Sequence, residues 1–328
     1  MKIFVTREIP GDFLEKLNIV GNELVASDLN RTLALEELSQ KSNGVDAILT
    51  LLTAKVDGDL MDAIGPQLKI ISNYAVGFDN IDVKAASERG ILVTNTPSEE
   101  VDEAVAEHTW ALILSLTRRI VESDEATRRG AYRGWEPNMF IGTSLKGKTL
   151  GIIGLGGIGT MVAKRALGYD MNVVYFKRTR DMACEEKMGV KYCGMDAILG
   201  ESDVISLHVP LTDETRHLIN KHSLSKMKPG AYIINTARGP IINETDLVEA
   251  LRSGRIAGAG LDVFENDPNI SPELYDMPNV VTTPHIASAT REARNKMGEQ
   301  AVAAILDTLS GTKPQNLVDE SVWEKRRK

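Results

Sequence analysis

A glycine-rich turn in the middle of the chain constrains the fold most strongly. Residues 149–159 read TLGIIGLGGIG, a short apolar run that leads directly into the pattern GxGxxG. In such a turn Gly154 allows the chain to leave a strand tightly, Gly156 lets the backbone approach a pyrophosphate, and Gly159 lets the next helix pack on the strand. That helix is expected over residues 157–167, with its first N–H groups directed at phosphates. The run predicts a dinucleotide site that includes Gly157 and Ile158; a purely structural glycine turn is the alternative.

Length and charge limit the classes of protein that need to be considered. The chain has 328 residues and 42% hydrophobic content, enough for two domains with cores of their own. Its net charge is −8 and its calculated pI is about 5.3. Such a charge repels nucleic acid phosphates and anionic membranes. We therefore expect neither nucleic acid nor a membrane as a partner.

The cysteines and the N-terminal sequence indicate a reducing compartment. Cys184 and Cys193 are the only two cysteines, and they form neither a CxxC motif nor a cluster with histidines. This predicts no disulfide framework and no metal site. The opening run MKIFVT becomes polar by Arg7, without the long apolar stretch of a signal peptide. A cytoplasmic protein is expected.

The first hundred residues alternate between strand and helix patterns, which predicts a small parallel α/β unit without a phosphate-binding glycine loop. Strands are expected at 3–5, 47–51, 70–72 and 92–94, and helices at 10–17, 34–41 and 83–89.

A long helix follows and is interpreted as the crossing between two domains. Ser98 suits its N-cap, with Glu99, Glu100 and Asp102 in the first turn, and its pattern continues to Arg119. Beyond the glycine turn the alternation resumes, as in a doubly wound parallel sheet. Further strands are expected at 172–176, 204–207, 231–235, 256–261 and 279–282, with a helix at 244–253.

The C-terminal segment is expected to return to the first domain. A helix pattern over 289–309 is followed by GTKPQNLV, an extended stretch that could rejoin the N-terminal sheet, and the final EKRRK is expected to be solvated and frayed. The predicted fold is α/β with two Rossmann-like domains: a smaller flavodoxin-like substrate domain from 1–98 and 289–328, and a dinucleotide-binding domain from 99–288 inserted between two hinges.

The turn after the second strand of the dinucleotide domain is basic. Proteins that prefer NAD carry an acid there, which binds the ribose 2′-hydroxyl. Here the strand NVVYF is followed by Lys177, Arg178, Thr179 and Arg180, which suit a 2′-phosphate. We therefore expect NADPH to be preferred over NADH. The alternative is an ordinary solvated turn that leaves both cofactors usable.

Three later motifs each place a reactive side chain after a strand, at the edge where open α/β sheets bind ligands. IINTARGP presents Arg238, GLDVFENDP presents Asp262, Glu265 and Asp267, and VTTPHIASAT presents His285. Together with GLGGIG and with NYAVGFDNID at 73–82, these motifs resemble those of the D-isomer-specific 2-hydroxyacid dehydrogenases along nearly the whole chain. WEPNMFIG at 135–142 and the basic KRTR are most similar to the glyoxylate/hydroxypyruvate reductase branch.

The resemblance implies a role for each of these side chains. Arg238 would bind the carboxylate and carbonyl of a small 2-oxo acid, His285 would donate the proton, and Asp267 would pair with His285. The family more often has Glu at the position of Asp267, and Glu265 is the competing partner, otherwise expected to be solvated or structural. Reduction of a carbonyl by hydride leaves charge on oxygen, so a cation and an acid are needed nearby. A carboxylate partner favours the imidazolium form.

The remaining candidates extend the cofactor and substrate sites. Asp262 is expected to position cofactor or backbone rather than to transfer protons, and His208 is implied to line the adenine pocket. His108 is expected to be packed, and His217 and His222 to face solvent. Further candidate cofactor-binding residues are Thr109, Val209, Pro210, Thr236 and Ala237.

The substrate carboxylate suits the backbone N–H groups of Val76 and Gly77, because glycine permits close approach. The resemblance puts this loop opposite Arg238. Leu51 or Leu52 would bound a small apolar wall, or belong to the core. Trp135 lies in a loop that reaches a neighbouring subunit in similar reductases, which implies a homodimer.

Three functions remain open at this point. The leading hypothesis is an NADPH-dependent reductase of glyoxylate and hydroxypyruvate. A broader 2-oxo acid reductase or a phosphoglycerate dehydrogenase-like enzyme is the second, and a dinucleotide-sensing protein scaffold similar to the C-terminal binding protein corepressors is the third.

Overall fold

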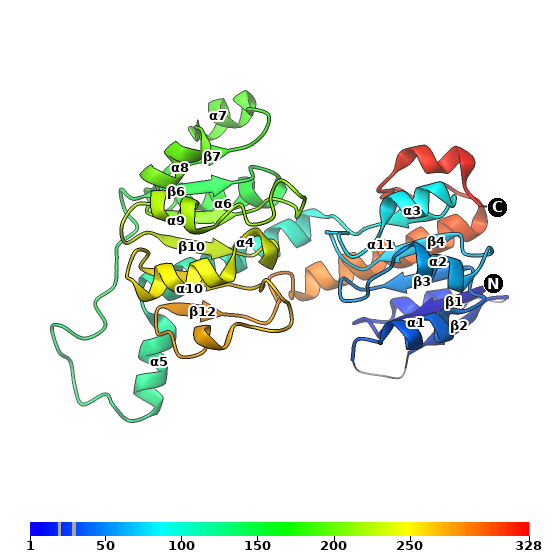
Figure 1. Ribbon diagram of the computed structural model, residues 1–328, viewed down its shortest axis with the longest axis horizontal. Helices are drawn as coiled ribbons and strands as arrows, with labels where there is room; N and C mark the ends of the chain where they lie inside the picture. Colours follow the sequence, from blue (N-terminus) through cyan, green and yellow to red (C-terminus); the bar gives the residue numbers. More distant parts are fainter. Residues whose placement is uncertain (19–20, 28–30, 328) are drawn as a thin grey trace. The chain divides into compact units, whose positions relative to one another are not determined.

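The computed structural model describes residues 1–18, 21–27 and 31–327. The chain divides into two compact units (Figure 1). Unit 1 comprises Met1–Val101 and Thr290–Lys328, and unit 2 comprises Asp102–Ala289. Each unit is built around its own parallel sheet, so the α/β class with two Rossmann-like folds is confirmed.

Unit 1 contains a five-stranded sheet in the order β2-β1-β3-β4-β5, which is the flavodoxin-like order. Its strands are β1 (Lys2–Val5), β2 (Glu23–Ala26), β3 (Ala47–Thr50), β4 (Ile70–Asn73) and β5 (Leu92–Thr94). The sequence pattern missed β2 because this edge strand is half exposed and lacks an apolar run.

The helices of unit 1 are α1 (Leu35–Ser42), α2 (Gly58–Ile64), α3 (Val83–Glu88) and α11 (Arg291–Ser310), with short 3₁₀ helices at Phe13–Leu17 and Glu320–Lys325. The helix expected over 10–17 was wrong in its first turn, because Gly11 has a φ of +85° that no α-helix accommodates. Helix α2 was missed; its N-cap Asp57 accepts a hydrogen bond from the N–H of Leu60 at 3.1 Å.

The C-terminal segment completes unit 1. Leu317 bridges Thr94 on β5 in antiparallel fashion, which confirms that this stretch rejoins the first sheet. The frayed end that we expected is wrong as far as Arg327, whose guanidinium donates to the carbonyls of Arg89, Gly65 and Leu68 at 2.8, 3.0 and 3.2 Å. Lys328 lies outside the described residues.

Unit 2 contains a seven-stranded parallel sheet in the order β12-β11-β10-β9-β6-β7-β8. The order reverses between β9 and β6, next to the strand that precedes the glycine turn, and a doubly wound sheet binds ligands at such a reversal. The strands are β6 (Thr149–Ile153), β7 (Asn172–Phe176), β8 (Lys191–Tyr192), β9 (Val204–Leu207), β10 (Tyr232–Asn235), β11 (Gly258–Leu261) and β12 (Val280–Thr282).

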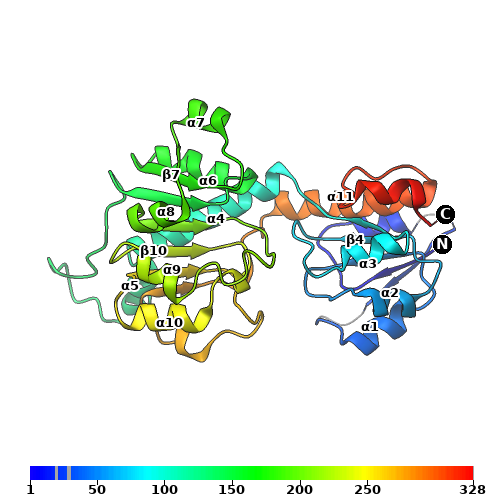
Figure 2. The same cartoon turned by 45° about the horizontal axis from the view of Figure 1, so that its top comes forward.

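Helices cover both faces of this sheet (Figure 2). One apolar core joins the sheet to α8, α9 and α10, and the other joins it to α4 and α6. The helices are α4 (Glu99–Thr117), α5 (Ile120–Arg128), α6 (Gly157–Leu167), α7 (Met182–Met188), α8 (Met195–Glu201), α9 (Lys221–Lys226) and α10 (Glu244–Arg252), with 3₁₀ turns at Gly239–Ile241 and Pro272–Leu274.

The long helix α4 begins where the sequence predicts, since the Ser98 hydroxyl accepts a hydrogen bond from the N–H of Val101 at 3.3 Å. It ends at Thr117 rather than at Arg119, which adopts a left-handed φ of 52° and starts the separate helix α5. Within the described part of the chain, no helix is long and apolar enough to cross a membrane.

Candidate active site

The glycine turn between β6 and α6 has the geometry that a bound dinucleotide requires. Gly154 has a φ of +101°, and a Cβ there would collide with the carbonyl oxygen of His208. A Cβ on Gly159 would collide with the carbonyl oxygen of Gly154, so helix α6 packs against the turn only because this residue is glycine. Each of these two glycines therefore has a steric reason that can be located in the structure.

The start of helix α6 leaves room for phosphate. Its N-cap residue is Gly156, and a Cβ built on Gly156 would point into open space. A Cβ on the next residue, Gly157, would instead meet the carboxylate of Asp102. Backbone N–H groups at an uncovered helix start attract anions. This turn fits a nicotinamide dinucleotide, with Gly157 and Ile158 in the first turn of the helix.

The basic turn after β7 is only partly available to a ligand. Lys177 Nζ lies 3.3 Å from Asp181 Oδ2. Arg180 donates through Nε and Nη2 to the two oxygens of Glu185 at 2.8 and 2.7 Å. Arg180 and the Tyr175 hydroxyl hold the pKa of Glu185 at about 2, so the pair is charged at neutral pH.

Arg178, Thr179 and Arg180 are all exposed in this turn. Because Arg180 is already held by a bidentate ion pair, Arg178 is the arginine of the turn that is better placed to meet a phosphate.

His208, at the end of β9, is held neutral by its surroundings. Its Nε2 lies 2.8 Å from the hydroxyl of Ser206, and burial lowers its pKa to about 3. A neutral imidazole at this edge of the sheet can line an uncharged part of a ligand. Val209 is half-buried and Pro210 exposed in the loop that follows.

Thr109 and Thr236 join helix α4 to the end of β10. Their hydroxyl oxygens lie 3.0 Å apart, and the Thr109 hydroxyl also donates to the carbonyl of Val105. Thr109 is fully buried and Thr236 nearly so. These contacts hold the end of β10 against helix α4.

Arg238 is presented by a tight turn that follows β10. The buried Asn235 side chain accepts from the N–H of Ala237 at 3.0 Å and donates to the carbonyl of Arg238 at 2.9 Å. The Arg238 guanidinium donates to the Ala237 carbonyl at 2.8 Å. A Cβ on Gly239 would collide with the carbonyl of Phe264, which explains the glycine after the arginine. These contacts of the ARGP turn therefore hold the Arg238 side chain in its direction.

Asp262, at the end of β11, is a fully buried carboxylate with donors from the segment after β12 and from His108 of helix α4. It accepts from the Thr283 hydroxyl at 2.6 Å and from the N–H groups of Ile286 and Ala287, both at 2.8 Å. Burial by itself raises the pKa of Asp262, but hydrogen bonds from His108, Thr283 and the two N–H groups outweigh it and hold the pKa below its usual value. Asp262 therefore anchors the turn that carries His285.

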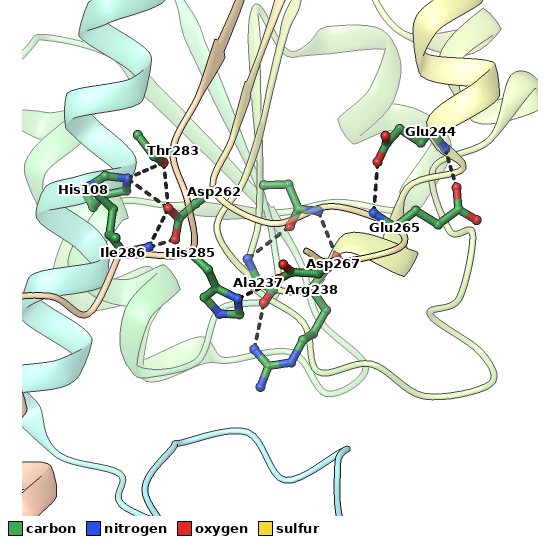
Figure 3. A network of polar contacts seen from close by, with 12 residues as sticks. His108, Ala237, Arg238, Glu244, Asp262, Glu265, Asp267, Thr283, His285 and Ile286 are labelled. Carbon is green, nitrogen blue, oxygen red and sulfur yellow. Dashed lines mark hydrogen bonds and ion pairs between the residues drawn. The ribbon is translucent and has the colours of Figure 1, made fainter. Parts of the chain in front are cut away.

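His285 and Asp267 form the pair that the resemblance implies. His285 Nδ1 lies 2.9 Å from Asp267 Oδ2, and both side chains remain partly exposed (Figure 3). The pairing uses Nδ1, which leaves Nε2 as the nitrogen able to face a substrate. Arg238, Asp262 and His285 follow β10, β11 and β12, which are consecutive neighbours in the sheet. Figure 3 shows the Arg238 and His285 side chains extending in the same direction from these strand ends.

Glu265 has a structural environment instead. Its carboxylate accepts from the N–H of Glu244 at 2.8 Å, and its own N–H donates to the Glu244 carboxylate at 2.9 Å. It also lies 2.6 Å from Nε2 of His217. His217 was expected to face solvent; its side chain is 37% exposed, and the ring also pairs with this acid.

The substrate-side candidates in unit 1 lie in two loops after strands. Val76 and Gly77 follow β4, where side-chain amides fix the loop: Asn95 donates to the Val76 carbonyl at 2.7 Å and Asn73 to the Gly77 carbonyl at 2.9 Å. Among the residues that the structure describes, neither the Val76 nor the Gly77 N–H donates to a protein acceptor. Leu52, half-buried, follows β3.

Trp135, in unit 2, is 80% exposed. It lies in the long segment between α5 and β6, together with other exposed apolar side chains.

The sequence did not reveal the polar residues that support the site. His108 Nε2 lies 2.9 Å from the Thr283 hydroxyl and 3.5 Å from Asp262, although the sequence suggested only a packed histidine. Neither contact follows from spacing along the chain, since 175 positions separate His108 from Thr283. Across the described residues, no group of three or more His, Cys, Asp or Glu side chains could hold a metal ion.

Comparisons with known proteins agree with this geometry. Residues 110–287 match the family described as D-isomer specific 2-hydroxyacid dehydrogenase, NAD binding domain. A glyoxylate reductase of Thermococcus litoralis is 46% identical, over 98% of this chain and 97% of that protein. A crystal structure of a Thermus thermophilus protein superimposes with a TM-score of 0.90 at 41% identity, covering 97% of this chain and 100% of the other.

A structure from Sinorhizobium meliloti extends the comparison to a bound coenzyme. It is described as an NADPH-dependent glyoxylate/hydroxypyruvate reductase in complex with NADP and malonate. It has a TM-score of 0.87 and 34% identity, covering all of this chain and 98% of the other. The resemblance drawn from the strand-end motifs is thus confirmed. The chain belongs to the D-isomer specific 2-hydroxyacid dehydrogenase family and is an NAD(P)-dependent oxidoreductase.

Proposed function

We propose that this enzyme reduces small 2-oxo acids, glyoxylate and hydroxypyruvate, to 2-hydroxy acids, with NADPH preferred over NADH. The observation that carries the proposal is the 2.9 Å contact between His285 Nδ1 and Asp267, at the same edge of the sheet as the strand end that presents Arg238. This arrangement offers a proton donor and a cation at one edge of a dinucleotide-binding sheet. The glyoxylate reductases among its relatives support the choice of substrate.

Arg238 binds the substrate in this mechanism. Its planar guanidinium can contact the carboxylate and the neighbouring carbonyl oxygen of a 2-oxo acid together. As the carbonyl carbon is reduced, negative charge grows on that oxygen, and the guanidinium stabilises it.

His285 supplies the proton to the same oxygen. Asp267 accepts from Nδ1 and so orients the ring, which leaves Nε2–H to face the substrate. After transfer the neutral ring regains a proton from solvent. In the oxidative direction the neutral His285 accepts the hydroxyl proton.

The coenzyme, when bound, supplies the hydride. Its pyrophosphate would be held by the turn from Gly154 to Gly159 and the start of α6. We assign His208, Val209 and Pro210 to the adenine side. The edge of the coenzyme site nearest Arg238 is assigned to Thr236, Ala237 and Asp262. The buried Thr109 contributes by holding the Thr236 hydroxyl.

NADPH preference is assigned to the exposed part of the turn after β7. Arg178 provides forked donors for a 2′-phosphate, with Thr179 and Lys177 as further contacts. Arg180 contributes less than the sequence alone suggested, because Glu185 already engages its Nε–Nη2 edge in a bidentate ion pair.

Unit 1 carries groups of its own that suit a small acid in this proposal. The Val76 and Gly77 N–H groups are suited to an anion, and Leu52 restricts the substrate to a small side chain. Unit 1 thus acts as the substrate domain and unit 2 as the dinucleotide domain. The free Cys184 and Cys193 agree with a reducing, cytoplasmic environment.

A homodimer is proposed through α5 and the segment that follows it. All nine residues of α5 are exposed or half-buried, and the helix extends with its following loop away from the sheet of unit 2 (Figure 1). Exposed apolar side chains gather there, and such patches are typical of subunit interfaces. They are Ile120, Val121, Tyr132, Trp135, Met139 and Ile141.

A parallel assay tests the function. Loss of NADPH absorbance is followed after adding glyoxylate, hydroxypyruvate, pyruvate or 3-phosphohydroxypyruvate, each repeated with NADH. Turnover of the first two with the highest kcat/KM supports the proposal. A preference for pyruvate indicates a broader reductase, and 3-phosphohydroxypyruvate indicates a phosphoglycerate dehydrogenase-like enzyme. Binding of NADPH without turnover of any acid would indicate a dinucleotide-sensing scaffold.

A further inference from the structure

A chain of hydrogen bonds leads from helix α4 to the turn that carries His285. It starts at His108, passes through the Thr283 hydroxyl, and ends at the buried carboxylate of Asp262 (Figure 3). We propose that His108 is a positioning residue, which sets the orientation of His285 through Thr283 and Asp262. The inference rests on the proposed role of His285 as proton donor.

Each hydrogen bond between His108 and Asp262 has one possible direction. Asp262 is ionised and can only accept, so the Thr283 hydroxyl donates to it at 2.6 Å. Having used its single hydrogen, Thr283 must accept from His108, whose Nε2 is 2.9 Å away. His108 therefore carries a proton on Nε2, and an aliphatic side chain there would leave the Thr283 oxygen without this donor.

Asp262 holds the turn that carries His285 through both its side chain and its main chain. Its carboxylate holds the N–H groups of Ile286 and Ala287, and its carbonyl oxygen accepts from the His285 N–H at 2.9 Å. Asp262 thus contacts three consecutive residues of the turn.

His285 has a left-handed φ of 56°, a conformation that a non-glycine residue keeps only when its surroundings enforce it. The contacts to Asp262 provide this enforcement. A change at the start of the chain of hydrogen bonds is therefore expected to alter the direction of the catalytic ring.

The test compares two substitutions of His108. His108→Leu removes the donor and is expected to lower kcat about 10- to 100-fold, since small misplacements of a catalytic group have effects of this size. His108→Gln keeps an N–H near the position of Nε2 and is expected to restore kcat to within about threefold of wild type. KM and the Kd for NADPH, measured by fluorescence titration, are expected to stay the same in both. His222→Gln, on an exposed histidine, is the matched control.

Substitutions of Thr283 test the next step. Thr283→Val should reproduce the loss of kcat, and Thr283→Ser should largely avoid it, with thermal unfolding midpoints recorded for every variant. Three results would overturn the inference: kcat of His108→Leu within twofold of wild type, equal losses in His108→Gln and His108→Leu, or a loss that follows the fall in midpoint.

Two further measurements separate this inference from the proposed function. If His285→Gln retains turnover, the role of His285 itself fails; if it loses turnover while His108→Leu does not, only the positioning role fails. Nitrogen-15 NMR of the five histidines at alkaline pH gives a readout that does not depend on activity. We expect His108 as the Nε2–H tautomer, and an Nδ1–H tautomer would contradict the chain of hydrogen bonds.

Discussion

Two histidine–carboxylate pairs take their acids from the loop that follows β11, and the surroundings of the two acids differ. Glu265 pairs with His217 at 2.6 Å and Asp267 pairs with His285 at 2.9 Å, and both histidines have a positive φ. Glu265 is also bound to the N–H of Glu244, so both of its oxygens are engaged. Asp267 lies in the exposed part of the loop, and its histidine follows β12, at the same edge of the sheet as the end of β10 that presents Arg238.

A histidine–acid pair is therefore not by itself a sign of catalysis. In the first pair the acid ties the loop to the start of α10, and the imidazole adds one more hydrogen bond. In the second pair the acid holds the ring by one nitrogen and leaves the other available, which general acid catalysis requires. The surroundings of the acid, rather than the contact distance, separate the two roles.

Exchanging each histidine for glutamine should show the difference between the two pairs most clearly. His285→Gln is expected to lower kcat by about 10²- to 10⁴-fold, because the proton donor is lost, while the Kd for NADPH is unchanged. His217→Gln is expected to leave kcat within about threefold. Steady-state kinetics with glyoxylate and fluorescence titration with NADPH provide the measurements. A His285→Gln enzyme within tenfold of wild type would refute the assignment.

The two acids should show opposite effects. Asp267→Asn is expected to lower kcat about 10- to 100-fold with little change in the free energy of unfolding, because its charge supports His285. Glu265→Gln is expected to lower the free energy of unfolding by about 1–2 kcal/mol, since the amide cannot satisfy both donors. Urea unfolding and kcat are measured for both variants. Equal profiles would remove the distinction between the pairs.

The basic turn also contains two arginines with different surroundings: Arg180 is engaged by Glu185, and Arg178 is better placed to meet a ligand. Arg178→Ala is expected to raise the Kd for NADPH about tenfold, through loss of 2′-phosphate contacts, without changing the Kd for NADH. Arg180→Ala, which removes the partner of Glu185, should change the Kd for NADPH by less than about threefold. A clear NADH preference of the wild-type enzyme, or a larger effect at Arg180, would contradict the proposal.

His208 provides a third histidine, one whose neighbour is a hydroxyl. Its pKa is lowered from 6.5 to about 3, so protonation favours the unfolded chain, and the stability present above pH 6.5 is lost as the pH falls toward 3. Between about pH 7.5 and about pH 5.5 the loss should be about 1 kcal/mol. His208→Gln should lack this contribution, as urea unfolding at the two pH values would show. An unchanged pH dependence would mean that the ring titrates normally.

Much of the fold could be predicted because the apolar runs of parallel strands are continuous. Strands β6, β7 and β9 and helix α6 lie where the sequence suggested, since each is buried and bounded by turn residues. The edge strand β2 and the short helices α7 to α9 did not show such runs. Their places are set by tertiary contacts, as in the T-shaped packing of Tyr175 on Tyr192 of β8.

The places of the candidate catalytic residues in the sheet could be predicted to a similar degree, but the residues that support them could not. Arg238, Asp262 and His285 could be identified because parallel strands bring their carboxyl ends to one edge. The contact of His108 with Thr283 depends on how α4 packs against the sheet, which no local pattern encodes. The ion pair of Arg180 with Glu185 likewise depends on where α7 begins, so the basic turn suggested more available charge than the structure leaves.

The division of unit 1 into two stretches of sequence has a consequence for biosynthesis. Helix α11 packs on β3 and β4, with the Ser72 hydroxyl donating to the Ala301 carbonyl, yet the ribosome makes this helix only after all of unit 2. Unit 2 is continuous and can complete its core while the early sheet still has one bare apolar face. During synthesis the strands of unit 1 therefore keep one apolar face exposed until helix α11 has been made. We expect a chaperone to bind that face longest.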